Sequence, residues 1–225
     1  MERSAVAGRR ERRQRNARGQ GARLGEDILG AALALIDRTG SQESVTLRAI
    51  AREIGIAAPS IYPHFEDRDA IVMAVVARLF DDLTAAIRAG VVAAGGDPVE
   101  RLVAGCQAYV RFGLDHPARY GVLFSGTRPP ATAEYCEPVV IGPDGRPVLE
   151  FGAESFALLV DAIAACVSAG RSASTDVIAD GTAVWVALHG TVTLRTSLAA
   201  FPWPEPASEF VRQLVLPLAK IGAAG

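Results

Sequence analysis

A twenty-residue stretch, 46–65 (TLRAIAREIGIAAPSIYPHF), carries the spacing that two short crossing helices need. Ala51 is small enough for a close helix crossing, and Gly55 tolerates the left-handed backbone of a tight turn. Ile61, six residues after Gly55, supplies an apolar contact back to the first helix. The offsets predict a helix-turn-helix, whose second helix can lie in the major groove of DNA. The spacing alone also fits an ordinary helical hairpin.

The flanking residues distinguish these alternatives. The run IYPHFEDRDAI, after TLRAIAREIGIA, resembles the N-terminal domain of the tetracycline-repressor (TetR) family of bacterial transcription regulators, over about residues 24–72. The resemblance implies that Thr46 caps a helix and touches a phosphate, and that Arg48 reaches a base edge or a phosphate. It implies further DNA contacts at Ala58, Pro59, Ser60, Tyr62, Pro63, His64 and Arg68, the last standing where the family often has Lys.

Two departures from the family pattern affect the expected readout of DNA. Ala57 stands where Ser commonly caps the recognition helix, so that cap is weak. Ala58, Pro59 and Pro63 offer no hydrogen bonds to bases. We therefore expect readout to depend on Arg48, Ser60, the basic N-terminal arm and DNA shape.

The N-terminal arm differs in charge from the rest of the chain. Residues 1–23 hold eight Arg and two Glu, a charge of +6, whereas the other 202 residues hold 15 basic and 23 acidic groups, a charge of −8. The arm has few large apolar residues and is expected to be disordered when alone. Its arginines, with Arg12, Arg13 and Arg15 central among them, can enter a minor groove or follow phosphates. The alternative is a solvated tail that attracts DNA nonspecifically.

Helical periodicity and breakers predict an all-α protein. The TetR resemblance implies that an N-terminal three-helix helix-turn-helix domain precedes a C-terminal helical bundle for ligand binding and dimerisation. The domain boundaries are an arm at 1–23, a DNA-binding domain at 24–69 and an effector-binding and dimerisation domain at 70–225. Helices are expected from Leu24 to Gly40, then at 47–53, 58–64, 67–93, 98–115, 118–124, 151–169, 175–200 and 207–221, with Pro217 kinking the last. Residues 125–150 form an irregular segment, and no strand is expected.

Composition excludes several classes of protein. Half of the 225 residues are apolar and 21% are charged, which is a soluble globular composition. No apolar segment follows the arginines as in a signal peptide, and the apolar run Phe156–Val167 is too short to span a bilayer. Cys106, Cys136 and Cys166 do not have metal-site spacing. We expect a cytoplasmic, nucleoid-associated protein without enzymatic activity, cofactor or metal.

The C-terminal region contains the pattern Trp-x₃-His-Gly at Trp185 and His189. With the upstream run HPARYGVLF, it resembles a TetR subgroup named for its Trp-His-Gly signature. The family commonly encloses an effector pocket here, and a mostly apolar pocket suits a hydrophobic small molecule. Candidate lining residues are Phe80, Tyr109, Phe112, Tyr120, Phe124, Phe156, Trp185 and His189. For Trp185 and His189 the alternative is a partly buried core pair near a dimer interface.

The resemblance also implies a homodimer in which the last two helices pair with their mates, so that two recognition helices read a palindromic operator. The expected function is that of a repressor released from DNA when an effector shifts the helix at 67–93. Two alternatives remain open. One is an activator or a ligand-independent regulator, and the other is an enzyme or small-molecule binding protein on the same fold.

Overall fold

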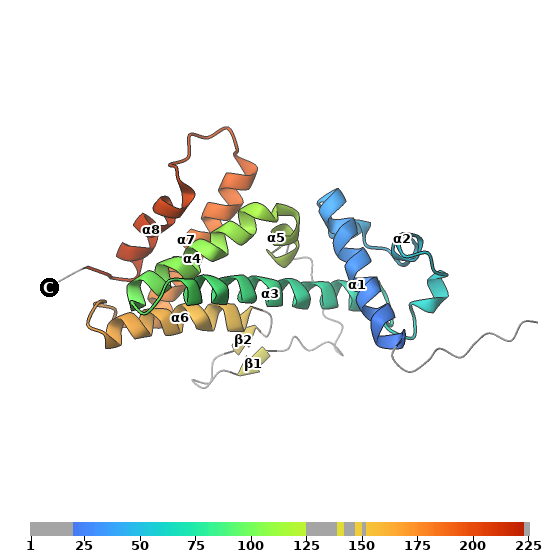
Figure 1. The fold of residues 1–225 in the computed structure, drawn as a ribbon, viewed down its shortest axis with the longest axis horizontal. Helices are drawn as coiled ribbons and strands as arrows, with labels where there is room; N and C mark the ends of the chain where they lie inside the picture. Colours follow the sequence, from blue (N-terminus) through green and yellow to red (C-terminus); the bar gives the residue numbers. More distant parts are fainter. Residues whose placement is uncertain (1–19, 125–138, 142–146, 150–151, 223–225) are drawn as a thin grey trace, which may run out of the picture.

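The computed structural model describes residues 20–124, 139–141, 147–149 and 152–222. The described chain is almost entirely helical, which confirms the all-α class. The α-helices are α1 (Gln20–Thr39), α2 (Leu47–Glu53), α3 (Arg68–Ala93), α4 (Pro98–Asp115), α5 (Pro117–Phe124), α6 (Ala153–Ser168), α7 (Val177–Ser197) and α8 (Ala207–Leu218). In Figure 1, α3 runs horizontally, with α1 and α2 at one end and the remaining helices around its other part.

Local signals set the boundaries of the first helices. The helix α1 begins at Gln20, four residues before the predicted Leu24. It ends where Gly40 adopts a φ of +71° and its N–H donates 2.8 Å to the Ile36 carbonyl. The helix α2 begins after Thr46, whose hydroxyl oxygen accepts from the Ala49 N–H at 3.1 Å. The predicted end of this helix at Gly40 and the predicted cap at Thr46 are therefore confirmed.

The turn after α2 has the expected glycine, but the second helix is shorter than predicted. Gly55 has a φ of +69°. Only Ala58–Ser60 form a helix, the 3₁₀ turn η2, and the prediction of a helix to His64 is wrong. Two prolines explain the difference: neither Pro59 nor Pro63 has an N–H to donate, and Pro63 would follow Pro59 by one helical turn. The chain instead turns through hydrogen bonds from the His64 and Phe65 amides to the Ile61 carbonyl.

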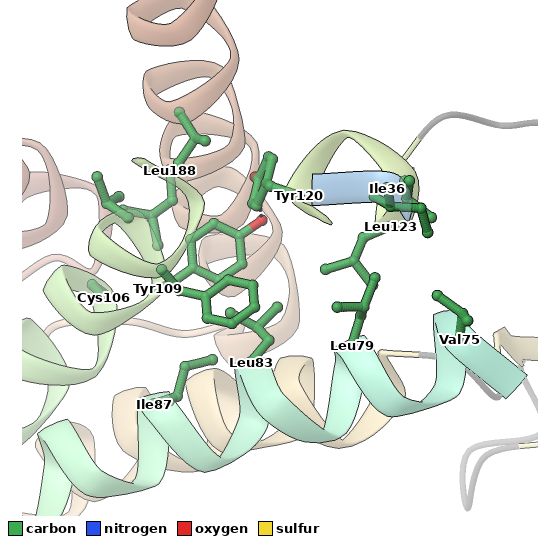
Figure 2. Packing of buried hydrophobic residues seen from close by; sticks show 14 of the residues in the cluster. Ile36, Val75, Leu79, Leu83, Ile87, Cys106, Tyr109, Tyr120, Leu123 and Leu188 are labelled. Carbon is green, nitrogen blue, oxygen red and sulfur yellow. Dashed lines mark hydrogen bonds between the residues drawn. The ribbon is translucent and has the colours of Figure 1, made fainter. Parts of the chain in front are cut away.

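The helix α3 runs through the hydrophobic core and contributes a row of buried residues to it. Asp67 caps it by accepting from the Ala70 N–H at 2.8 Å. Buried residues recur every four positions along one side, at Val75, Leu79, Leu83 and Ile87. Figure 2 shows this row facing Ile36 of α1, Leu123 of α5 and the ring of Tyr109 on α4. One continuous apolar cluster therefore joins α1 to the C-terminal helices.

The other helices surround α4. Pro98 lies in its first turn, as predicted, and Asp97 accepts from the amides of Val99 and Glu100. The helix α4 packs against α3, α6, α7 and α8. A close approach to α7 depends on Gly113, where an added methyl group would come within 2.5 Å of Val192. His116 separates α4 from α5, which begins at Pro117, one residue before the predicted start at 118.

Two short strands correct the expectation of none. Val139–Ile141 (β1) and Pro147–Leu149 (β2) pair antiparallel, with Val140 opposite Val148. Three residues are too few to produce a clear alternating pattern in the sequence, which explains why they were not predicted. The sequence Pro143-Asp144-Gly145 is typical of a turn, but it lies outside the described residues. The helix α8 ends at Leu218 and not at Ile221, because Lys220 takes a φ of +55° and Ile221 bridges to Ser172.

Candidate functional site

The first candidate surface is formed by α2, η2 and the turn that follows. The helix α2 and η2 pack against each other, with Ala51 and Ile61 both buried as their spacing predicts. Thr46 and Arg48 are exposed in the first turn of α2. The Thr46 hydroxyl oxygen accepts a backbone hydrogen bond, and a hydroxyl can donate its proton at the same time to an acceptor such as a phosphate oxygen.

The side chains that follow Gly55 differ in how far they are exposed to solvent. Ile61 is fully buried, whereas the adjacent Tyr62 side chain is 56% exposed. Pro59 and Pro63 are also exposed, as expected, but Ala58 and Ser60 are half-buried. His64 is half-buried too, and a methyl group at Gly25 would lie 3.9 Å from its Nδ1, so the imidazole lies beside α1.

Arg68 differs from the other predicted contacts because each of its three guanidinium nitrogens donates to an acceptor in the protein. Its Nε donates 2.8 Å to the Val45 carbonyl and its Nη2 donates 2.9 Å to the Gln42 carbonyl. Its Nη1 donates 3.1 Å to Asp69. All three nitrogens are thus engaged. Arg12, Arg13 and Arg15 of the arm lie outside the described residues.

The second candidate site is a cluster of aromatic rings from α3, α4, α5, α6 and α7. The Tyr120 hydroxyl lies 2.8 Å from the Tyr109 hydroxyl and 2.8 Å from His189 Nδ1. Figure 2 shows the Tyr109 and Tyr120 rings above α3. Phe124 lies 4.6 Å from the His189 ring, centroid to centroid, and 6.1 Å from Phe80. Trp185 connects Phe124, His189 and Phe156 at centroid distances of 6.3 to 6.5 Å.

Seven of the eight predicted lining residues are therefore in ring contact with one another. Phe112 is the eighth, and its ring pairs with His116, 5.3 Å away. Thr193, which is not among the predicted lining residues, has its hydroxyl 3.5 Å from His189 Nε2. The repeated four-residue spacing of Trp185, His189 and Thr193 on α7 was the available signal.

The polar groups of this cluster are uncharged near neutral pH. Burial raises the pKa of Tyr109 to about 12, and burial together with the neighbouring Tyr109 raises the pKa of Tyr120 further. Burial lowers the pKa of His189, because an imidazolium loses hydration there. The cluster is thus an apolar environment with a few neutral polar groups.

The outward side of α7 is unusually apolar. Ile178, Val186, Leu194 and Leu198 are each more than two-fifths exposed. By length and composition alone, α7 could cross a membrane, a test that core helices of soluble proteins also pass. In the part of the chain that the structure describes, no group of three or more His, Cys, Asp or Glu could hold a metal ion.

Two family models match this chain. Residues 28–75 match the model described as "Bacterial regulatory proteins, tetR family". Residues 102–218, about half of the chain, match "Tetracyclin repressor-like, C-terminal domain". A likeness to the Trp-His-Gly subgroup stays a prediction.

One curated relative resembles the chain in sequence, and several solved structures resemble it in fold. An uncharacterized HTH-type transcriptional regulator of Mycobacterium tuberculosis is 34% identical over 99 residues, and the match spans 44% of each protein. A Rhodococcus sp. RHA1 protein of unknown function has a TM-score of 0.68 and 25% identity, over 87% of this chain and 91% of that one.

A bacterial regulatory protein in the tetR family, from Rhodococcus RHA1, has a TM-score of 0.65 and 18% identity, over 88% of this chain and 97% of that one. At that identity the likeness concerns the fold. Together with the two family models, the helix-turn-helix and the helical bundle identify the protein: the chain belongs to the tetR family of bacterial regulatory proteins, which are DNA-binding transcription regulators.

Proposed function

We propose that the protein is a transcription repressor that binds a palindromic operator as a homodimer and leaves it when a small hydrophobic effector binds. In this proposal, residues 24–69 bind DNA, residues 70–225 bind effector and dimerise, and the Arg-rich arm adds electrostatic attraction to DNA. In this proposal the protein is located in the cytoplasm, at the nucleoid. It regulates transcription and has no catalytic role.

The helix-turn-helix surface carries the proposal. Thr46 and Tyr62 are exposed groups that can donate to phosphate oxygens, and Arg48 presents a guanidinium from the second position of α2. The recognition segment is only one 3₁₀ turn followed by Tyr62, Pro63 and His64. Because that segment offers few donors to base edges, the proposal assigns much of the sequence preference to Arg48, Ser60 and DNA shape.

The outward face of α7 supports a homodimer. Between Gly181 and Leu194 the helix has no Asp, Glu, Lys or Arg, and apolar residues along it are exposed. Exposed apolar patches of this kind mark protein–protein interfaces. Arg195 contacts the segment between α7 and α8, because its guanidinium pairs with Glu205 at 2.6 Å and lies 5.2 Å from the Trp203 ring centroid. The proposal pairs α7 and α8 with their mates around a two-fold axis.

The aromatic cluster is the proposed effector site, and α3 is the element through which it acts. Phe80 of α3 contacts Phe124 in the cluster, whereas Arg68 at the start of the same helix contacts the helix-turn-helix. An effector that binds better when α3 is shifted would change the separation of the two recognition segments. A differential affinity of about 1–3 kcal/mol is typical of such coupling.

The experiment is quantitative binding of the full chain to a duplex from upstream of its own gene. We expect this duplex to be preferred over a duplex of the same length and scrambled sequence. Arg48→Ala combined with Tyr62→Ala should weaken binding at least tenfold, because both residues are proposed contacts. Arg101→Ala, on an exposed position of α4, is the control that should leave affinity unchanged. Equal affinity of wild type and double variant would contradict the proposal.

A further inference from the structure

Arg68 stands at the junction of α3 and the helix-turn-helix, and its side chain is directed to the protein backbone. The Gln42 and Val45 carbonyls that it binds mark the two ends of the 3₁₀ turn η1 (Gln42–Ser44). The Gln42 carbonyl also accepts the Val45 N–H at 3.1 Å. Val45 is fully buried, and Thr46, the cap of α2, follows it directly.

Local hydrogen bonds fix the rest of this turn. The Ser41 hydroxyl oxygen accepts from the Glu43 N–H at 3.1 Å, and the Thr39 and Ser44 hydroxyls lie 2.9 Å apart. The turn is therefore a rigid unit attached to the end of α1. The Arg68 guanidinium joins this unit to α3, which is more than 20 residues further along the chain.

The charge around Arg68 is unfavourable for a phosphate contact. Glu66, Asp67 and Asp69 flank it, so the four residues 66–69 carry two more negative than positive charges. Asp69 also accepts from the Arg68 Nη1 at 3.1 Å. A phosphate that approached this guanidinium would meet the Asp69 carboxylate that already accepts from it, and the negative charges of Glu66 and Asp67 next to it in the sequence weaken the attraction further.

We propose that Arg68 is a positioning residue for DNA binding, which fixes Thr46 and the start of α2 relative to α3 and does not itself contact a phosphate. The planar guanidinium holds two carbonyls and a carboxylate at once, which the single ammonium of Lys cannot reproduce. This inference rests on the proposed function, because it assigns to Arg68 a role in placing the Thr46 phosphate contact.

The test combines salt-dependent DNA binding with hydrogen exchange on the full chain. A side chain that contacts phosphate contributes about 0.9 per contact to the slope of log K against log salt, or about 1.8 for two half-sites. We expect Arg68→Lys and Arg68→Ala to weaken binding to the upstream duplex about tenfold with an unchanged slope, since a hydrogen bond to a charged group is worth about this factor. Arg48→Ala should reduce the slope.

Hydrogen exchange in the DNA-free protein gives an independent readout. Arg68→Lys should accelerate exchange of the amides between Glu43 and Ile50, because the turn loses its connection to α3. Arg78→Lys is the matched control. This residue lies on the same helix and pairs with the carboxylates of Glu26 and Asp82, so exchange near α2 should not change.

The outcomes separate the inference from the function on which it rests. If wild type does not bind the duplex, the proposed function fails, and hydrogen exchange still decides whether Arg68 holds the turn. If Arg68→Lys binds and exchanges like wild type while Arg68→Ala reduces the salt slope by about 1.8, Arg68 contacts phosphate and the inference is overturned.

Discussion

The guanidinium of Arg119 on α5 donates hydrogen bonds of 2.8 and 2.7 Å to the two carboxylate oxygens of Asp37 on α1. The next residue along α5, Tyr120, lies in the aromatic cluster against Tyr109 and His189. One short helix therefore contacts the helix-turn-helix region through one residue and the proposed effector site through its neighbour. This arrangement gives α5 a direct connection to both proposed functional regions.

The Arg119–Asp37 pair makes a pH-dependent contribution to stability. The hydrogen bond from Arg119 holds the pKa of Asp37 below its ordinary value. A depressed folded-state pKa gives stability that is present above the unfolded pKa, about 3.9, and is lost as pH falls through the folded pKa. Asp37→Asn should therefore lower the free energy of unfolding by up to about 1 kcal/mol at pH 7, since the pair is partly exposed.

Urea denaturation at pH 7, 5, 4 and 3 measures this effect. The difference between wild type and Asp37→Asn should be constant from pH 7 to 5 and shrink at the lowest pH values. Asp115→Asn, at an exposed carboxylate of α4, is the control and should show little difference at any pH. A difference that grows as pH falls would show that the pair does not act in this way.

The Tyr120 hydroxyl serves two polar neighbours in the aromatic cluster. Tyr120→Phe keeps the ring but leaves the Tyr109 hydroxyl and His189 Nδ1 without this partner. We expect a loss of about 1–3 kcal/mol in the free energy of unfolding, because polar groups become unsatisfied where they are shielded from water. Tyr62→Phe is the matched control, since Tyr62 is exposed, and it should change stability by less than about 0.5 kcal/mol. Equal effects of the two changes would contradict the role given to Tyr120.

Gly55 has a positive φ, which an L-amino acid adopts at a cost. Gly55→Ala should destabilise the protein by about 1 kcal/mol, although nothing lies within 4 Å of the added methyl group. Gly121 on α5 also has open space around its Cα but lies within a helix and has no positive φ, so Gly121→Ala should stabilise by up to about 1 kcal/mol. Thermal unfolding of both variants compares the two sites, and a stabilising Gly55→Ala would contradict the backbone argument.

The exposed side of α7 gives a prediction about assembly. Val186→Asp places a charge on this face and should convert a dimer into monomers, measured by sedimentation at micromolar concentration. Val92→Asp on α3 introduces the same charge at a side chain that is 79% exposed, and it should leave the dimer intact. A wild-type chain that sediments as a monomer, or a Val186→Asp variant that remains dimeric, would remove α7 from the proposed interface.

Local sequence signals predicted most helix boundaries but not the contacts between distant residues. Gly40, Thr46 and Pro98 act on their own turns, so their effects were predictable from spacing. The effect of Pro59 and Pro63 together, which shortens the recognition helix, was underestimated although it is also local. Arg68 bonds to carbonyls 23 and 26 residues earlier, and Arg119 to a carboxylate 82 residues earlier. Such partners depend on how the helices pack, which no local pattern specifies.

The residues of the aromatic cluster were predictable in part from local sequence patterns. Periodicity identified apolar faces, and seven of the eight predicted aromatic and histidine residues lie together because those faces converge around α3. Phe112 pairs instead with His116, the residue that follows the end of α4. The four-residue spacing of these two side chains was the available local signal for this pair.

Two helix-turn-helix surfaces of the proposed dimer should read one two-fold symmetric site, and hydroxyl-radical footprinting of the upstream duplex measures this. We expect protection of two inverted half-sites on one face of the duplex, with centres one helical turn, about 10 base pairs, or a multiple of it apart. The Arg48→Ala, Tyr62→Ala double variant should lose both protections together. A single unsymmetrical protected site, or protection that survives in the double variant, would contradict the account.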